Sequence, residues 1–267
     1  MNLREKFETK VPATHHIESL EGKVSAEEWQ LRVDLAATYR LVAMYGWDDM
    51  IFTHISARVP GPEHHFLINP YGLLFEEITA SSLVKIDVDG NKVVDSPYPV
   101  NPAGFTIHSA LHMNRDDAHC VIHLHTDDGV AVSAQADGLL PLDQHAMVLL
   151  GDVAYHDYEG IALDLDERER LVADIGRDKH VMMLRNHGTL TLGKSCADAF
   201  MRMYYLERAC TMQVRALAGG TKPNVPNQGV PEKTAEQGAM AFEGLLGALA
   251  WPALLRKLDR LDAGFRH

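Results

Sequence analysis

The chain has 267 residues, of which 46% are hydrophobic and 23% charged, a composition typical of a folded globular protein rather than a disordered one. Its 25 lysines and arginines against 37 aspartates and glutamates give a net charge of −12, which argues against nucleic acid and membrane surfaces as partners. Three scattered cysteines predict reduced thiols, and the sequence contains neither a signal-like apolar leader nor a membrane-length apolar run. We therefore expect a cytoplasmic protein.

The N-terminal half is predicted to alternate helices and strands. Ser25 and Glu28 form a capping box, and apolar residues at helical spacing predict a helix that ends at Gly46. Three strands are expected next, over residues 51–59, 66–69 and 84–88, the last ending at an Asp-Gly-Asn turn. A short helix over 103–113 and a β-branched strand over 118–124 follow.

The C-terminal half continues this pattern up to a proline-rich segment. We predict a helix over 127–134, a strand pair over 146–155, a helix over 167–175 and a strand over 181–184. Ser195 then caps a long helix that Gly219 and Gly220 close. Residues 221–233 should form an extended linker, and amphipathic stretches over 235–250 and 252–261 predict a terminal helix pair.

These elements indicate one α/β domain without internal repeats. We divide the chain into an irregular N-terminal arm (1–24), the domain itself (25–220) and a C-terminal extension (221–267) that we expect to make oligomer contacts.

The segment CVIHLHT carries the first candidate site residues. His123 and His125 are two apart on a predicted strand, so both imidazoles project from the same face and can reach one metal ion. A catalytic zinc site usually has three protein ligands and one open position, so a third ligand is required. His187 is the best candidate because RNHG follows an apolar strand and Gly188 provides a tight turn. A bare HxH pair is equally compatible with a half-buried polar strand face.

Several separated segments carry a family resemblance. HSALHMNRDDAHCVIHLHT, PLDQHAMVLLGDVAYHDYEG and VMMLRNHGTLTLG resemble the class II aldolase/adducin family over residues 27–220. Within that family the chain is more similar to the adducin head domain than to the sugar-phosphate aldolases.

The resemblance implies a three-layer α/β/α fold with a central, largely antiparallel sheet. It further implies a homotetramer with sites at subunit interfaces, and zinc held by the histidines that match His123, His125 and His187. In the related aldolases and epimerases, zinc stabilises the enediolate of a small ketose phosphate. Nickel or cobalt would also suit imidazole ligands.

The chain departs from the aldolase pattern at the acid/base and phosphate-binding positions. The aldolases carry a glutamate four residues before the histidine that matches His108, and this sequence has Gly104 there. Their phosphate-binding loops correspond here to IFTHIS, NPYG and NPAG. The side chains of Thr53, His54 and Asn101 are therefore candidate substrate-binding groups for a smaller acid or sugar.

Two other histidine positions leave alternatives open. His145 falls near the place where the aldolases bring a tyrosine from the adjacent subunit, so it is a candidate acid/base group or else a surface loop histidine. His108 and His112 are four apart on a predicted helix, and we interpret them as a packed or solvated pair rather than metal ligands.

Two functions are compatible with these residues. The first is a zinc-dependent lyase or isomerase that acts on a small hydroxy-carbonyl or sugar-derived compound. The alternative is an adducin-like oligomeric binding or scaffold protein whose metal is structural or vestigial, as the replacement of the glutamate by Gly104 suggests.

Overall fold

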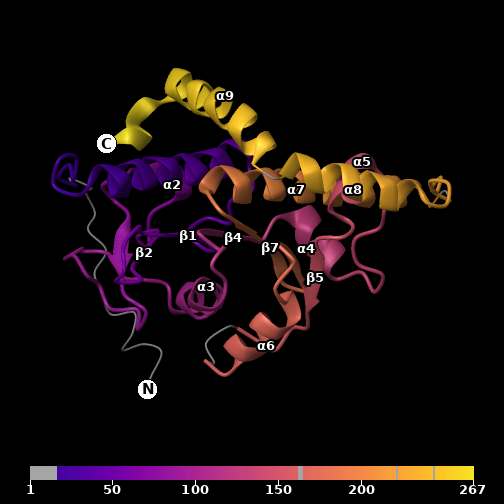
Figure 1. Ribbon diagram of the computed structural model, residues 1–267, viewed down its shortest axis with the longest axis horizontal. Coiled ribbons are helices and arrows are strands. Elements are labelled where there is room, and N and C mark those ends of the chain that lie inside the picture. The colour runs from indigo at the N-terminus through magenta and orange to yellow at the C-terminus, as the bar shows by residue number, and fades with distance from the viewer. Residues whose placement is uncertain (1–16, 162–164, 221, 243) are drawn as a thin grey trace.

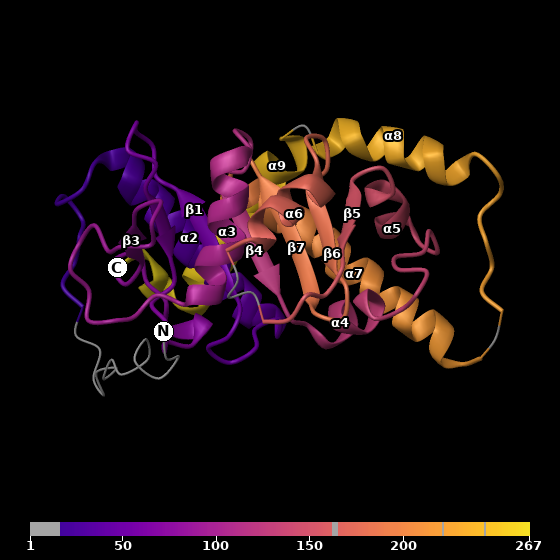
Figure 2. The same ribbon diagram turned by 90° about the horizontal axis from the view of Figure 1, so that it is seen from below.

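The computed structural model describes residues 17–161, 165–220, 222–242 and 244–267, and is built on one seven-stranded sheet (Figure 1). Its strands are β1 (His54–Arg58), β2 (Phe66–Ile68), β3 (Val84–Ile86), β4 (Cys120–Leu124), β5 (Val153–His156), β6 (Val181–Leu184) and β7 (Gly188–Gly193). The strand order is β3-β2-β1-β4-β7-β6-β5, and every neighbouring pair is antiparallel except β5 and β6 (Figure 2).

Helices cover both faces of this sheet. They are α2 (Ala26–Tyr45), α3 (Pro102–Asn114), α4 (Asp127–Ser133), α5 (Gln144–Leu149), α6 (Glu167–Ile175), α7 (Cys196–Ala218), α8 (Val230–Phe242) and α9 (Leu245–Leu261), with 3-10 turns η1 (Phe75–Glu77) and η2 (Ala263–Arg266). Helices α2, α7 and α9 lie above the sheet in Figure 1, and α3 and α6 lie below it. The expected three-layer α/β/α fold with a largely antiparallel sheet is confirmed.

The alternation of side chains along β4 explains how the sheet divides the core. Ile122 belongs to the larger apolar cluster under α2 and α7, whereas Val121 belongs to the smaller cluster under α3 and α6. Because strand side chains alternate between faces, His123 lies on the same face as Val121. His123, the polar residue of this strand, therefore faces the α3 layer.

Local capping signals account for the two long helices. Ser25 accepts a hydrogen bond from the Glu28 N–H at the start of α2, and Gly46 ends that helix with a φ of 69°. Ser195 likewise accepts from the Asp198 N–H at the start of α7. These predicted helix ends are confirmed.

Three predictions of secondary structure were wrong. Residues 144–149 form helix α5 instead of a strand, because the Asp143 carboxylate accepts from the N–H groups of His145 and Ala146 and so starts a helix. Only β5 remains of the predicted strand pair. The strand β7 over GTLTLG was missed, since its glycines favoured a turn.

The third wrong prediction is the position of the break in the terminal helix pair; the pair itself is present, as α8 and α9. Its break lies at Gly244, which has a φ of 90°, and Pro252 lies inside α9. The buried Trp251 indole N–H donates to the Asp34 carboxylate at 3.0 Å, so packing on α2 holds the helix despite the proline. Helix α8 also begins at Val230, inside the segment we expected to be a linker.

The structure bears only partly on the predicted N-terminal arm, and it bears on membrane spans through its described helices. The predicted arm falls mostly outside the described residues, which begin at residue 17, and residues 17–24 contain no regular element. Among the described helices, none alone is long and apolar enough to cross a membrane; α8 and α9 reach that composition only as a pair bent by 61°.

Candidate metal centre

Three histidines from separate parts of the chain meet at one end of the sheet. His123 lies on β4, His125 follows that strand, and His187 lies in the turn between β6 and β7. One ring nitrogen from each can be chosen so that all three lie within 4.8 Å of one another. The structure thus brings together the three residues that the sequence analysis selected as ligands.

The β6–β7 turn reaches this position because of its backbone. Asn186 has a φ of 57°, a left-handed conformation that asparagine tolerates better than most residues. A Cβ on Gly188 would lie 2.3 Å from the Leu124 carbonyl oxygen, so only glycine allows β7 to approach β4 this closely. The sequence NHG therefore positions His187 against the other two rings.

Hydrogen bonds orient the rings of His123 and His125. The Nδ1 atom of His123 lies 3.0 Å from the Thr189 carbonyl oxygen, and Nδ1 of His125 lies 3.1 Å from an Asp49 carboxylate oxygen. Because a carbonyl or a carboxylate only accepts, both Nδ1 atoms donate. In the neutral rings each Nε2 is then a bare lone pair.

These two lone pairs face one another. The Nε2 atoms of His123 and His125 are 3.0 Å apart, and when both rings are neutral in these tautomers neither carries a proton to donate to the other. Two acceptors at that distance repel unless a cation lies between them. Tetrahedral zinc with bonds of about 2.0–2.1 Å places two ligand nitrogens about 3.3 Å apart, so the arrangement fits such an ion closely.

Burial favours the neutral, metal-binding form of two of the three imidazoles, His123 and His187. Burial, followed by the charges of His187, His54 and His125, holds the pKa of His123 well below its usual value. Burial and the neighbouring His125 and His156 lower the pKa of His187 to about 4. Among the described residues, no fourth histidine, cysteine or acid belongs to the cluster, so a bound ion would keep an open position.

Two of the candidate substrate-binding residues lie beside this cluster. The ring of His54 is 5.0 Å from that of His123, its partner across the β1–β4 pair, and His54 is buried. Thr53 has a φ of 63° and a buried Oγ1 atom with no hydrogen-bond partner among the described residues. Asn101 is half-buried immediately before α3. Their roles in binding remain predictions.

The glycine that replaces the aldolase glutamate has a packing reason. A Cβ on Gly104 would lie 2.7 Å from Cδ2 and 2.8 Å from Cγ of His54. Any side chain at 104 would therefore displace the His54 ring. The two departures from the aldolase pattern, at 54 and 104, are coupled in space.

His145 contacts residues other than the three histidines. Its ring packs at 4.9 Å from Tyr205 of α7, and its Nδ1 atom is 3.3 Å from the Asp143 carboxylate. The resemblance implied a contribution from an adjacent subunit, so its acid/base role stays a prediction.

Sequence reasoning missed two residues of the site and a third that lies behind it. Asp49, which orients His125, lies 76 positions earlier in the chain. Tyr158 lies half-exposed with its ring 5.9 Å from that of His187, beside a cavity of about 590 Å³. Glu207 of α7 is buried behind β4 and β7, where Thr126 donates to it at 2.5 Å and Thr189 at 2.8 Å. The Tyr-His-Asp-Tyr segment of the resemblance could have suggested only Tyr158.

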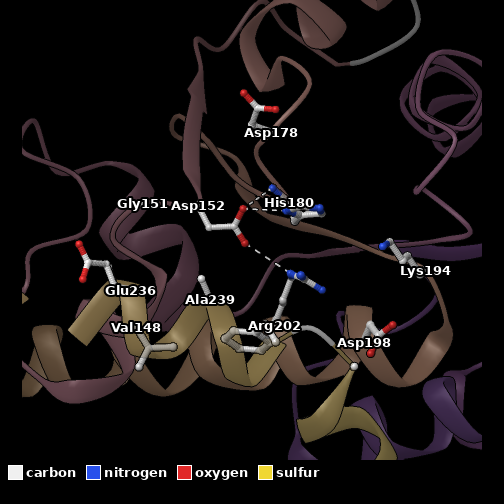
Figure 3. A pocket seen from close by; sticks show the side chains of 13 residues that line it. Val148, Gly151, Asp152, Asp178, His180, Lys194, Asp198, Arg202, Glu236 and Ala239 are labelled. Atoms are coloured by element: carbon white, nitrogen blue, oxygen red, sulfur yellow. Dashed lines mark hydrogen bonds and ion pairs between the residues drawn. The ribbon is translucent and has the colours of Figure 1, made fainter. Parts of the chain in front are cut away.

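A larger cavity of about 720 Å³ lies at the opposite end of the sheet, where β6 begins and β7 ends (Figure 3). Three of its polar groups are paired: Asp152 accepts from His180 at 2.8 Å and from Arg202 at 3.4 Å. The guanidinium of Arg202 also stacks at 5.1 Å over Phe242. We place the candidate site at the histidines, because among the described residues these three form the group that could hold a metal ion.

Comparison with known proteins identifies relatives that match most of this chain. The family model described as "Class II Aldolase and Adducin N-terminal domain" matches residues 33–214. A Caulobacter vibrioides protein whose name places it among aldolase class 2 proteins, without settling its activity, is 61% identical over 92% of this chain and 96% of its own length. Mouse alpha-adducin is 43% identical over 88% of this chain, which spans 34% of that protein.

Solved structures show the same fold. An aldolase II superfamily protein from Pseudomonas syringae has a TM-score of 0.89 and 53% identity over 94% of this chain and all of that one. An L-fuculose 1-phosphate aldolase from Glaciozyma antarctica has a TM-score of 0.77 and 26% identity, over 97% and 98% of the two chains.

Proposed function

The chain belongs to the class II aldolase and adducin N-terminal domain family, and from that premise we propose that it is a zinc-dependent lyase. Its substrate would be a small hydroxy-carbonyl or sugar-derived compound. His123, His125 and His187 would hold the metal. The observation that carries this proposal is the pair of Nε2 atoms 3.0 Å apart, which are both free of protons in the neutral tautomers and which a metal ion bound to both would reconcile.

The chain's own residues prepare the site for such chemistry. When bound, the metal supplies a Lewis acid that stabilises negative charge on a carbonyl-derived oxygen. Asp49 and the Thr189 carbonyl hold two ligand rings in the tautomer that exposes Nε2, as second partners of metal-binding histidines do elsewhere. The unpartnered hydroxyl of Thr53 is available to bind a substrate oxygen.

Proton transfer requires a group other than the usual glutamate. The hydroxyl of Tyr158, beside His187, is one candidate within the chain. His145 from a neighbouring subunit is another, and its participation requires the homotetramer with interfacial sites that the family resemblance implies. The cytoplasmic location belongs to the same proposal.

A second function is favoured by one observation. That observation is Gly104, which lacks any side chain for proton transfer; mouse alpha-adducin, at 43% identity, is also among the relatives. On that reading the chain is an oligomeric binding or scaffold protein with a structural or vestigial metal.

Turnover separates the two functions. The zinc-loaded chain and its His187→Ala variant would be screened against small aldehydes, ketose phosphates and hydroxy acids, with carbon–carbon cleavage followed by coupled aldehyde detection. The lyase function requires a substrate whose turnover is lost in His187→Ala. A stable oligomer that binds zinc but cleaves none of these classes favours the scaffold function.

A further inference from the structure

A buried chain of hydrogen bonds runs from the candidate metal centre into the layer between β1 and α3. His54 Nδ1 lies 2.8 Å from His108 Nε2, and His108 Nδ1 lies 2.5 Å from the Ser56 hydroxyl. The same hydroxyl lies 2.6 Å from His112 Nε2. His112 Nδ1 ends the chain 2.6 Å from the Ala118 carbonyl oxygen. These four side chains, which we call the relay, are each at most 3% exposed.

The Ala118 carbonyl gives this chain a direction. A carbonyl only accepts, so His112 Nδ1 carries the proton and, in a neutral ring, His112 Nε2 is bare. The Ser56 hydroxyl must then donate to His112. Its oxygen therefore accepts from His108.

The direction of these hydrogen bonds continues to His54. If His108 Nδ1 donates to Ser56, its Nε2 is bare and accepts the proton of His54 Nδ1. His54 Nε2 is then the free end of the chain. It is an acceptor without a proton.

This direction requires neutral rings, and burial provides them. The pKa of His112 is lowered to about 3, chiefly by burial, and burial also holds the pKa of His108 well below its ordinary value. A proton added to His108 Nε2 would place two donors face to face, because His54 Nδ1 lies 2.8 Å away. The short distances leave no room for water between the partners.

The free end lies at the candidate metal centre. His54 is paired with His123 across β1 and β4, and their rings are 5.0 Å apart. The absence of a side chain at Gly104 allows the ring to occupy this place. His54 therefore stands where the aldolase pattern would put phosphate-binding and acid/base groups.

We infer that His54 Nε2 is a hydrogen-bond acceptor for a hydroxyl group of the bound substrate, and that His108, Ser56 and His112 are positioning residues that impose this tautomer. The inference deepens the proposed function and rests on it for the identity of the ligand. It specifies a ligand with a neutral hydroxyl at this end, because a phosphate oxygen would face a lone pair with no proton to share.

The tautomers are tested without any ligand. Neutron crystallography of the full-length chain at about pH 7 should find deuterons on Nδ1 of His54, His108 and His112 and none on their Nε2 atoms. A deuteron on His54 Nε2 would overturn the relay, whatever the protein does with metal or substrate.

The binding role is tested with two ketones that differ by one hydroxyl. Affinities of dihydroxyacetone and hydroxyacetone for the zinc-loaded chain would be measured by calorimetry. We expect the extra hydroxyl to improve the dissociation constant by about five- to tenfold, the effect of one net hydrogen bond. Ser56→Ala breaks the relay and should reduce that ratio to about twofold or less.

Matched variants separate positioning from mere packing. Ser56→Thr keeps the hydroxyl and should restore the ratio. Ser109→Ala removes a buried hydroxyl on α3 that donates to the Phe105 carbonyl and is not part of the relay. This variant should leave the affinity ratio unchanged. An equal loss of affinity for both ketones in Ser56→Ala would overturn the binding role of His54. If neither ketone binds the wild type, the ligand part and the proposed substrate class both fail, while the deuteron positions still decide the relay.

Discussion

Replacement of the buried Glu207 by glutamine tests the ionisation of the carboxyl group that lies behind the candidate site. Burial, opposed by hydrogen bonds from Thr126 and Thr189, raises the pKa of Glu207 from 4.5 to about 7. A raised folded-state pKa means that the stabilising contribution is complete below about pH 4.5 and is lost as the pH rises through about 7. Glutamine keeps the shape and an acceptor for Thr189, and it cannot ionise.

The magnitude follows from the size of that shift. The interval between 4.5 and about 7, at about 1.4 kcal/mol for each pH unit, corresponds to about 3 kcal/mol of lost stability above pH 7. Glu207 is 2% exposed, so solvent screening reduces this figure little. Because part of this loss already occurs below pH 5, the difference in free energy of unfolding between Glu207→Gln and wild type should grow by about 2–3 kcal/mol between pH 5 and pH 8.

Urea unfolding of both proteins at the two pH values measures this difference directly. Glu236→Gln, an exposed change on α8, is the control and should track wild type at both. A difference between Glu207→Gln and wild type that is the same at pH 5 and pH 8 would refute the reasoning, because Glu207 would then be ionised or protonated throughout.

Three further predictions concern the turn, the orienting carboxylate and the buried histidines. Gly188→Ala should abolish metal binding and lower stability by several kcal/mol, since its Cβ would meet a β4 carbonyl oxygen at 2.3 Å, whereas Gly151→Ala, with open space, should be tolerated in thermal unfolding and metal titration. Asp49→Asn should weaken zinc affinity by about 10- to 100-fold in a chelator competition, and the exposed neighbour Asp48→Asn should not. The pKa of His112 is lowered from 6.5 to about 3, so neutral His112 contributes stability that is complete above pH 6.5 and is lost as the pH falls toward 3. Between pH 7 and about pH 4.5, the free energy of unfolding of His112→Gln should therefore fall by about 2–3 kcal/mol less than that of wild type. Urea unfolding measures this difference.

Much of the fold was predictable because local signals agreed with the final packing. The caps at Ser25 and Ser195 and the glycine at 46 define helix ends through their own hydrogen bonds and backbone angles. The apolar run after Asp143 carries no clear period, and only the capping carboxylate, whose effect we overlooked, selects a helix there.

The ligand triad was predictable for a related reason. Strand alternation places His123 and His125 on one face, and the glycine after His187 indicates a tight turn. What the pattern does not contain is long-range contact. Asp49 lies in a loop whose position depends on the β1–β4 pairing, so nothing local marks it as the partner of His125.

The buried histidine relay shows the same limit more sharply. The spacing of His108 and His112 predicts a shared helix face and suggests a packed or solvated pair. Their connection through Ser56 to His54 depends on the register of β1 under α3, which brings together residues about fifty positions apart. A tautomer imposed from the Ala118 carbonyl is a property of that tertiary arrangement.

The central claim is that the three histidines form one metal site, and zinc content measures it most directly. Wild-type protein, extensively dialysed and analysed by plasma mass spectrometry, should hold about one zinc per chain. His123→Ala, His125→Ala and His187→Ala should each lose it, because two imidazoles with an open coordination sphere hold zinc poorly. Retention of stoichiometric zinc in all three variants, or its absence from wild type after growth with added zinc, would contradict the account.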